Sequence, residues 1–251
     1  MATTVVDPTL TAQEVRINED GLKFITPFSM MIAGPSQSGK SEFIWNLIKF
    51  REDVCMSNFT RIIYCQANIH SPKNKLFFER LQNEFPKIEM IQGLPDIHTL
   101  RLNLNSLPTL IIIDDLMKEV VKSSPMADLA TNDVHNHNIS IIFVFQNYFA
   151  RGQQGTSLIK NCHYKVLFYN RIELLELRNI STHTVVSPKF LEFNFNYLIK
   201  HFPNDPSHYI VIDGHNRSQL PWLFCKSHIF PKVKGGEIKP LIFFVNPNYK
   251  K

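Results

Sequence analysis

The sequence predicts an α/β fold with a central, mostly parallel β-sheet flanked by helices. Short apolar runs that match strands alternate along the chain with segments of helical periodicity. Two of these runs, 110–113 and 139–145, are almost continuously β-branched and aromatic, which is typical of strands buried on both faces. A length of 251 residues, with 44% hydrophobic and 20% charged residues, is sufficient for one sizeable core. A second domain is possible but not required.

The predicted elements divide the chain into an N-terminal arm (1–24), one α/β domain (25–231) and an extended or mobile tail (232–251). Between the two central runs, the chain can hold one broken or two short helices, with Ser124 as a candidate N-cap before Pro125. In order, we expect strand 29–33, helix 41–50, strand 61–65, helix 76–81, strand 88–91, strands 110–113 and 139–145, strand 164–168, helix 188–200 and strand 209–213.

The bulk properties restrict the class of protein. A net charge of +5 favours polyanionic partners, including nucleic acid, without proving them. The first residues lack the features of a signal peptide, and no apolar run approaches the roughly 20 residues of a membrane helix. We therefore expect no membrane span and a location in the cytosol or nucleus. The cysteines fit reduced thiols best, although Cys162, His163, Cys225 and His228 form a weak alternative pattern for zinc.

The segment after the first predicted strand matches the phosphate-binding pattern G-x-x-x-x-G-K-[ST]. In this pattern the backbone N–H groups surround phosphate oxygens, and the following helix directs its positive end toward them. Lys40 is expected to contact the β- and γ-phosphates of ATP, and Ser41 to place its hydroxyl on Mg²⁺. The predicted nucleotide-binding residues are Gly34, Pro35, Ser36, Gln37, Ser38, Gly39, Lys40 and Ser41.

Polar side chains end the two central strands, where parallel strands line a ligand crevice. Asp114 is predicted to hold Mg²⁺ through its water shell, and Asp115 to orient or polarise the attacking water. Gln146 follows the second strand and is expected beside Asp115 as a sensor of the γ-phosphate if the strands are neighbours. The alternatives are that an Asp only caps the next helix and that Gln146 only belongs to a turn.

These residues resemble the FtsK-HerA class of P-loop ATPases, specifically the genome-packaging ATPases of poxviruses, Maverick/Polinton elements and adintoviruses. The resemblance spans residues 24–231 and is weakest in the C-terminal quarter. A strand followed by Asn170-Arg171 also looks like the family, although the proline expected between these two residues is missing. The blocks that carry the likeness are 27–41, Gln92-Gly93-Leu94-Pro95, 110–117 and 137–147.

The resemblance implies a RecA-like P-loop NTPase fold of the ASCE division and a motor that threads double-stranded viral DNA into a preformed capsid. It implies a homo-oligomeric ring, a pentamer or hexamer, with a capsid or portal component as a partner. The location would be the virus assembly site in the host cytoplasm or nucleus, or the virion. A neighbouring subunit would supply an arginine, with Arg171 as the first candidate and Arg151 as the second. The loop 151–156 is a candidate DNA contact.

Two other functions remain open at this point. A nucleoside or nucleotide kinase also uses a P-loop and a neighbouring acid, but it should add an arginine-rich lid, and no arginine cluster follows Gln146. Another DNA-dependent ATPase or helicase-like motor would share the same residues. A non-catalytic adaptor with a vestigial site is disfavoured by the intact set of Lys40, Ser41, Asp114 and Asp115.

Overall fold

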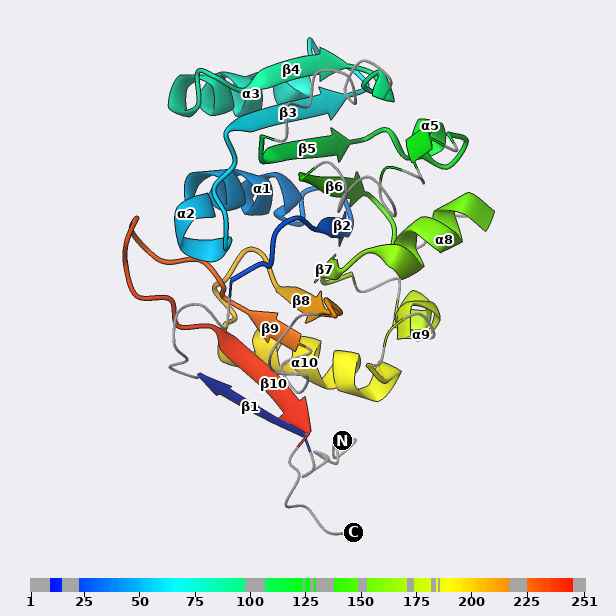
Figure 1. Ribbon diagram of the computed structural model, residues 1–251. Coiled ribbons are helices and arrows are strands. Elements are labelled where there is room, and N and C mark those ends of the chain that lie inside the picture. Colours follow the sequence, from blue (N-terminus) through cyan, green and yellow to red (C-terminus); the bar gives the residue numbers. More distant parts are fainter. Residues whose placement is uncertain are drawn as a thin grey trace.

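A computed structural model of the chain describes residues 10–14, 23–97, 107–123, 125–126, 129, 138–148, 153–170, 174–181, 184, 186–216 and 225–245. Within these residues, ten strands form one sheet in the order β1-β10-β9-β8-β7-β2-β6-β5-β3-β4 (Figure 1). The strands from β7 to β4 run parallel to one another, and the strands beyond β7 are antiparallel to their neighbours. The sheet therefore has a parallel half and an antiparallel half.

The parallel half is formed by apolar strands that are buried on both faces at its centre. In β2, every side chain is buried, and alternate residues pack on opposite faces: Met30 and Ile32 on one, Met31 and Ala33 on the other. The edge strand β4 is only partly buried. The strands are β7 (Tyr164–Phe168), β2 (Ser29–Ala33), β6 (Ile139–Phe145), β5 (Thr109–Asp114), β3 (Arg61–Gln66) and β4 (Glu89–Gln92).

The antiparallel half joins the two ends of the chain. β8 (Tyr209–Asp213) pairs with β7, and β9 (Cys225–Ser227) pairs with β8. β10 (Leu241–Val245) lies in the predicted tail and pairs with β1 (Leu10–Glu14) from the predicted arm. Arm and tail thus extend the same sheet, and the division into arm, domain and tail stays a prediction.

Helices cover both faces of the sheet and give a three-layer structure (Figure 1). One apolar core lies between the sheet and α1, α2 and α3, and the other lies between the sheet and α5, α8, α9 and α10. The helices are α1 (Lys40–Lys49), α2 (Arg51–Val54), α3 (Pro72–Glu84), α5 (Met117–Val120), α8 (Gln153–Asn161), α9 (Leu174–Ser181) and α10 (Pro188–His201). The hydroxyl of Ser187 caps α10 by accepting a bond from the Phe190 N–H.

Most of the expected elements are present, but one predicted loop is wrong. Residues 153–156, which belong to the candidate DNA loop, form the first turn of α8. This helix is held by Leu158 and Ile159, which are buried against the sheet, so packing of its apolar face outweighs the glycine at 155. The proposed cap at Ser124 lies outside the described residues.

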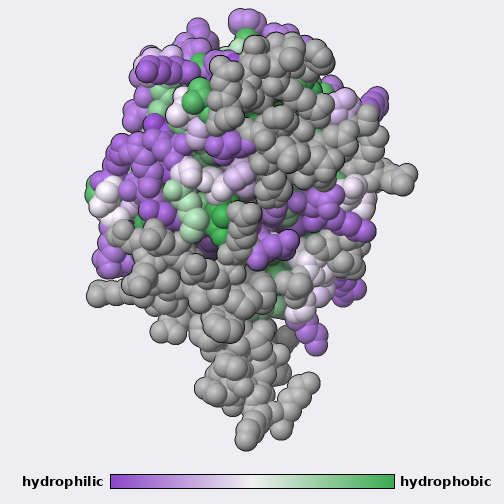
Figure 2. Space-filling view, viewed as in Figure 1, coloured by the Kyte–Doolittle hydropathy of each residue, from purple (hydrophilic) through white to green (hydrophobic). Residues whose placement is uncertain are grey.

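The face of the molecule seen in Figure 2 is largely hydrophilic where its residues are described, with small hydrophobic patches. Leu76 and Val233 are among the exposed large apolar side chains. None of the helices in the described part of the chain has the length and apolarity needed to cross a membrane.

Candidate nucleotide-binding and hydrolytic site

The predicted phosphate-binding loop lies between β2 and α1. β2 ends at Ala33, and α1 begins at Lys40, so the turn of the chain is made by residues 34–39. The Lys40 Nζ donates hydrogen bonds of 2.6 Å to the carbonyl oxygens of Gly34 and Pro35. This arrangement holds a positive charge over the loop, at the N-terminal end of a helix whose dipole adds to it. The loop is therefore suited to an anion.

Two glycines allow the loop to pack closely on the ends of β7 and β8. Gly39 has a φ of 102°, and a Cβ built there would lie 2.5 Å from the Cβ of Ser207. A Cβ on Gly34 would meet the Cβ of Phe168 at 2.5 Å. Both positions therefore exclude any larger residue, the first through backbone conformation and contact, the second through contact.

The loop also contains a buried polar atom that suits a ligand. The Ser38 Oγ is buried and has no hydrogen-bond partner among the described residues. A buried hydroxyl without a partner is unfavourable, and an oxygen-rich anion bound in the loop would give it one. The donor set thus fits a nucleotide phosphate: backbone N–H groups at a helix N-terminus, the Lys40 ammonium and the Ser38 hydroxyl.

Asp114 lies at the carboxyl end of β5, on the same edge of the sheet as the loop. Its Oδ2 accepts a 2.7 Å hydrogen bond from the hydroxyl of Tyr64, on the neighbouring strand β3. Burial raises the pKa of Asp114 to about 6, and the charge of Asp115 adds to this, while the Tyr64 bond and the Lys40 charge oppose it. Because the Lys40 charge acts on Asp114, the loop lysine and the predicted metal-binding carboxylate lie in the same site.

Asp115 and Gln146 are in direct contact, as expected if their strands are neighbours. β5 and β6 are adjacent, and the Gln146 Nε2 donates a 2.6 Å hydrogen bond to the Asp115 Oδ1. Both side chains are exposed, and Asp115 has a φ of 58°. The helix that follows begins at Met117 without a side-chain cap, so the capping alternative fails for Asp115. The catalytic roles of the two residues stay predictions.

The oxygen atoms of Ser41 and Asp114 also fit Mg²⁺ as ligands. Both offer oxygen ligands, which Mg²⁺ prefers, and Mg²⁺ bound with a nucleotide keeps several waters and needs few protein groups. Ser41 is exposed in the first turn of α1, and the Asp114 carboxylate lies at the end of β5, where the Tyr64 hydroxyl holds its Oδ2. These residues would hold the ion, whose chemistry is to neutralise charge on the phosphates.

Several supporting residues were not predicted from the sequence. Tyr64 holds Asp114 from β3. Tyr148, just past Gln146, donates from its hydroxyl to the carbonyl of Phe168 at the end of β7. The segment after β6 is therefore tied to the strand against which Gly34 packs. A buried tyrosine at a strand end carries no sequence signal for such a role, because its partner lies far along the chain.

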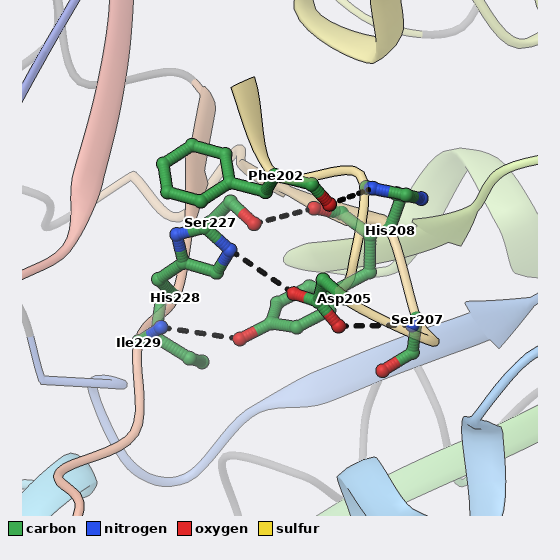
Figure 3. Close-up of polar contacts among 8 residues, drawn as sticks. Phe202, Asp205, Ser207, His208, Ser227, His228 and Ile229 are labelled. Carbon is green, nitrogen blue, oxygen red and sulfur yellow. Dashed lines mark hydrogen bonds and ion pairs between the residues drawn. The ribbon is translucent and has the colours of Figure 1, made fainter. Parts of the chain in front are cut away.

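The turn before β8 forms a second support for the loop (Figure 3). The Asp205 carboxylate accepts a 2.9 Å hydrogen bond from the Ser207 N–H and lies 3.3 Å from the Nε2 of His228. Burial raises the pKa of Asp205, but the bonds from His228 and Ser207 and the nearby histidines outweigh it, so the pKa lies below its usual value. This polar cluster fixes Ser207, the residue that contacts Gly39.

The structure does not test the two predicted arginines, and it separates the two histidines of the alternative zinc pattern. Arg151 and Arg171 lie outside the described residues, so the structure gives no position for either. His163 bonds to the Ser29 N–H at the amino end of β2, whereas His228 contacts Asp205 at the opposite edge of the sheet. In the described part of the chain, no group of three His, Cys, Asp or Glu side chains is arranged to hold a metal ion.

The fold is similar to that of solved viral proteins. The genome packaging NTPase B204 from Sulfolobus turreted icosahedral virus 2, solved with AMP, superposes with a TM-score of 0.51 at 17% identity, over 74% of this chain and 92% of that one. B204, the DNA-packaging ATPase from Sulfolobus turreted icosahedral virus, gives a TM-score of 0.51 at 18% identity, over 75% of this chain and 93% of that one. The chain has the fold of a viral genome-packaging ATPase. The fold expected from the sequence resemblance is confirmed.

The likeness is one of structure rather than sequence. No family model matches the chain, and no curated protein matches it. The structural similarity covers about three quarters of this chain and more than nine tenths of the B204 chains.

Proposed function

We propose that this chain is an ATP-hydrolysing motor that moves double-stranded viral DNA into a preformed capsid. The observation that carries the proposal is the contact between the Gln146 amide and the Asp115 carboxylate, on the strand edge that also holds Asp114 and the loop lysine. Binding a nucleotide does not require a water-orienting acid with an adjacent amide, whereas hydrolysis does. The fold similarity to packaging ATPases supports the link to DNA.

The residues of the site divide the work of hydrolysis. Lys40 binds the phosphates, and Ser41 and Asp114 hold Mg²⁺. Asp115 orients the attacking water, and Gln146, which donates a hydrogen bond to Asp115, senses the γ-phosphate. An arginine from the next subunit of a ring, Arg171 or Arg151, stabilises the charge that develops on the transferred phosphoryl group. Basic side chains meet the DNA phosphates without reading sequence, in agreement with the net charge of +5.

The test is ATP turnover with and without duplex DNA, combined with the mass of the assembled particle. We expect duplex DNA to raise turnover and ATP with DNA to favour a pentameric or hexameric ring. The Lys40→Ala variant is the inactive control: it removes the ammonium that contacts the phosphates, so turnover should be lost while the fold remains intact. Equal turnover with and without DNA would count against the motor, and a monomer would contradict an arginine supplied in trans.

The alternative function, a nucleoside or nucleotide kinase, is separated by the same measurement. A kinase would transfer the γ-phosphate to an added nucleoside or nucleotide and would release little inorganic phosphate without it. The exposed, amide-contacted Asp115 favours water as the acceptor, since water reaches an open carboxylate without a dedicated pocket.

A further inference from the structure

Gln66 is a buried glutamine at the carboxyl end of β3. Its side chain is 4% exposed, and its Oε1 is buried without a hydrogen-bond partner among the described residues. Buried amides in folded proteins normally find partners for both their oxygen and their nitrogen. An oxygen left unpaired at this position therefore needs an explanation.

The position of Gln66 puts its side chain next to the predicted nucleotide site. Gln66 is registered directly opposite Asp114 across β3 and β5. It is two residues beyond Tyr64, so both side chains point to the same face of the sheet, and the Tyr64 hydroxyl contacts Asp114 on that face. The same face is covered by α1, whose first residue is Lys40. Gln66 thus lies beside the carboxylate proposed to hold Mg²⁺, on the face of the sheet that α1 covers.

The chemistry of an amide oxygen limits what can pair with it. An oxygen of this kind only accepts hydrogen bonds, and neither an ionised carboxylate nor a fully ionised phosphate oxygen has a proton to give. The missing partner must therefore be a donor. Mg²⁺ bound through a carboxylate and phosphates keeps several water molecules, and these are strong donors because the ion polarises them.

We propose that Gln66 is a positioning residue of the Mg²⁺·ATP site, whose Oε1 accepts a hydrogen bond from a water in the shell of the ion held by Asp114. The inference rests on the proposed function and adds a third strand, β3, to the site. On this strand Tyr64 holds one oxygen of the carboxylate, and Gln66 holds a water of the ion. No covalent step is assigned to either residue.

The experiment compares Gln66→Leu, which removes the acceptor while keeping a similar volume, with Gln66→Glu, which keeps an acceptor oxygen. Binding of N-methylanthraniloyl-ATP is followed by fluorescence over a range of Mg²⁺ concentrations, together with thermal unfolding without nucleotide. We expect Gln66→Leu to raise the half-saturating Mg²⁺ concentration about tenfold. It should leave the melting temperature of the nucleotide-free protein equal or higher, because an unpaired buried oxygen is removed. Gln66→Glu should have a half-saturating Mg²⁺ concentration at or below that of the wild type.

The outcomes separate the inference from the proposed function. If the wild type binds the nucleotide and Gln66→Leu shows an unchanged Mg²⁺ dependence, or if Gln66→Glu is impaired as much as Gln66→Leu, the positioning role is wrong and the ATPase proposal stands. A lower melting temperature for nucleotide-free Gln66→Leu, with no change in Mg²⁺ dependence, would make the role structural. A wild type that binds no nucleotide at any Mg²⁺ concentration would overturn the proposed function itself.

Discussion

The parallel and antiparallel halves of the sheet treat their buried polar groups differently. In the antiparallel half, Lys226 is paired with Asp213 at 3.5 Å, and the Ser227 hydroxyl donates to the Tyr209 carbonyl. At the carboxyl edge of the parallel half, the Ser38 Oγ and Gln66 Oε1 are buried without partners in the described structure. These two strand residues of the antiparallel half have partners within the fold, whereas Ser38 and Gln66 carry buried groups that a ligand would satisfy. The parallel half thus carries the candidate nucleotide site, and the antiparallel half holds that site in place.

The same substitution in each half should give opposite results, and this is the largest effect we expect. Asp115→Asn should retain nucleotide binding and lower ATP turnover about 10² to 10⁴-fold, since a water-orienting base is lost. Its melting temperature should hardly change, because asparagine tolerates the φ of 58° and the side chain is exposed. Turnover, fluorescent-nucleotide binding and thermal unfolding measure these three quantities. Full activity would remove Asp115 from its assigned role.

Asp213→Asn is the matched variant in the antiparallel half. It should lower the free energy of unfolding by about 2 to 3 kcal/mol, because the nearly inaccessible Lys226 loses its charged partner. Turnover per folded molecule should stay at the wild-type value. A loss of turnover without a loss of stability in this variant would break the division between the two halves.

The two halves meet at Gly39 and Ser207, and a double-mutant cycle measures that contact. Gly39→Ala should cost about 1 to 2 kcal/mol from its φ of 102°, with a further cost from the 2.5 Å approach to the Ser207 Cβ. Adding Ser207→Gly should recover the second part and leave the first. Free energies of unfolding from urea titrations of the four proteins give the coupling. Strict additivity would mean that the loop does not depend on the antiparallel half.

The strands of the parallel half could be predicted because their sequences carry strong local signals. Runs such as 110–113 and 139–145 are apolar throughout, and a strand buried on both faces needs nothing else. β9 was not predicted because it is three residues long and has Lys226 at its centre. This buried lysine is paired with Asp213 on β8, and the sequence alone does not show that pairing. β10 has an apolar sequence, but the Gly and Pro residues around it led to the prediction of an extended or mobile tail instead of a strand.

The site was predicted where a residue's role depends on its own segment. The phosphate-binding loop is one continuous motif, and the pairing of Asp115 with Gln146 followed from two strands that proved to be neighbours. Tyr64, Gln66 and Ser207 could not be found in this way, because each acts through a residue on another element. Their positions are set by the register of the sheet and by close contact, which are properties of the folded chain.

The smallest predicted effect concerns the turn that fixes Ser207. The pKa of Asp205 is lower in the folded protein than its unfolded value near 3.8. Its ionised carboxylate therefore stabilises the fold at pH values above 3.8, and this stabilisation is lost as the pH falls through the folded pKa. Asp205→Asn keeps an oxygen that can accept the Ser207 N–H but removes the charge that faces His228.

We expect Asp205→Asn to lower the free energy of unfolding at neutral pH by a few tenths to about 1 kcal/mol, as for other partly exposed ion pairs. The difference from the wild type should persist down to about pH 5 and shrink below about pH 4, where the wild-type carboxylate also becomes neutral. Urea titrations at a series of pH values measure it. A difference that grows on acidification would contradict a lowered pKa. Unchanged ATP turnover would show that the antiparallel half supports the loop through the contact of Ser207 with Gly39 rather than through the charge of Asp205.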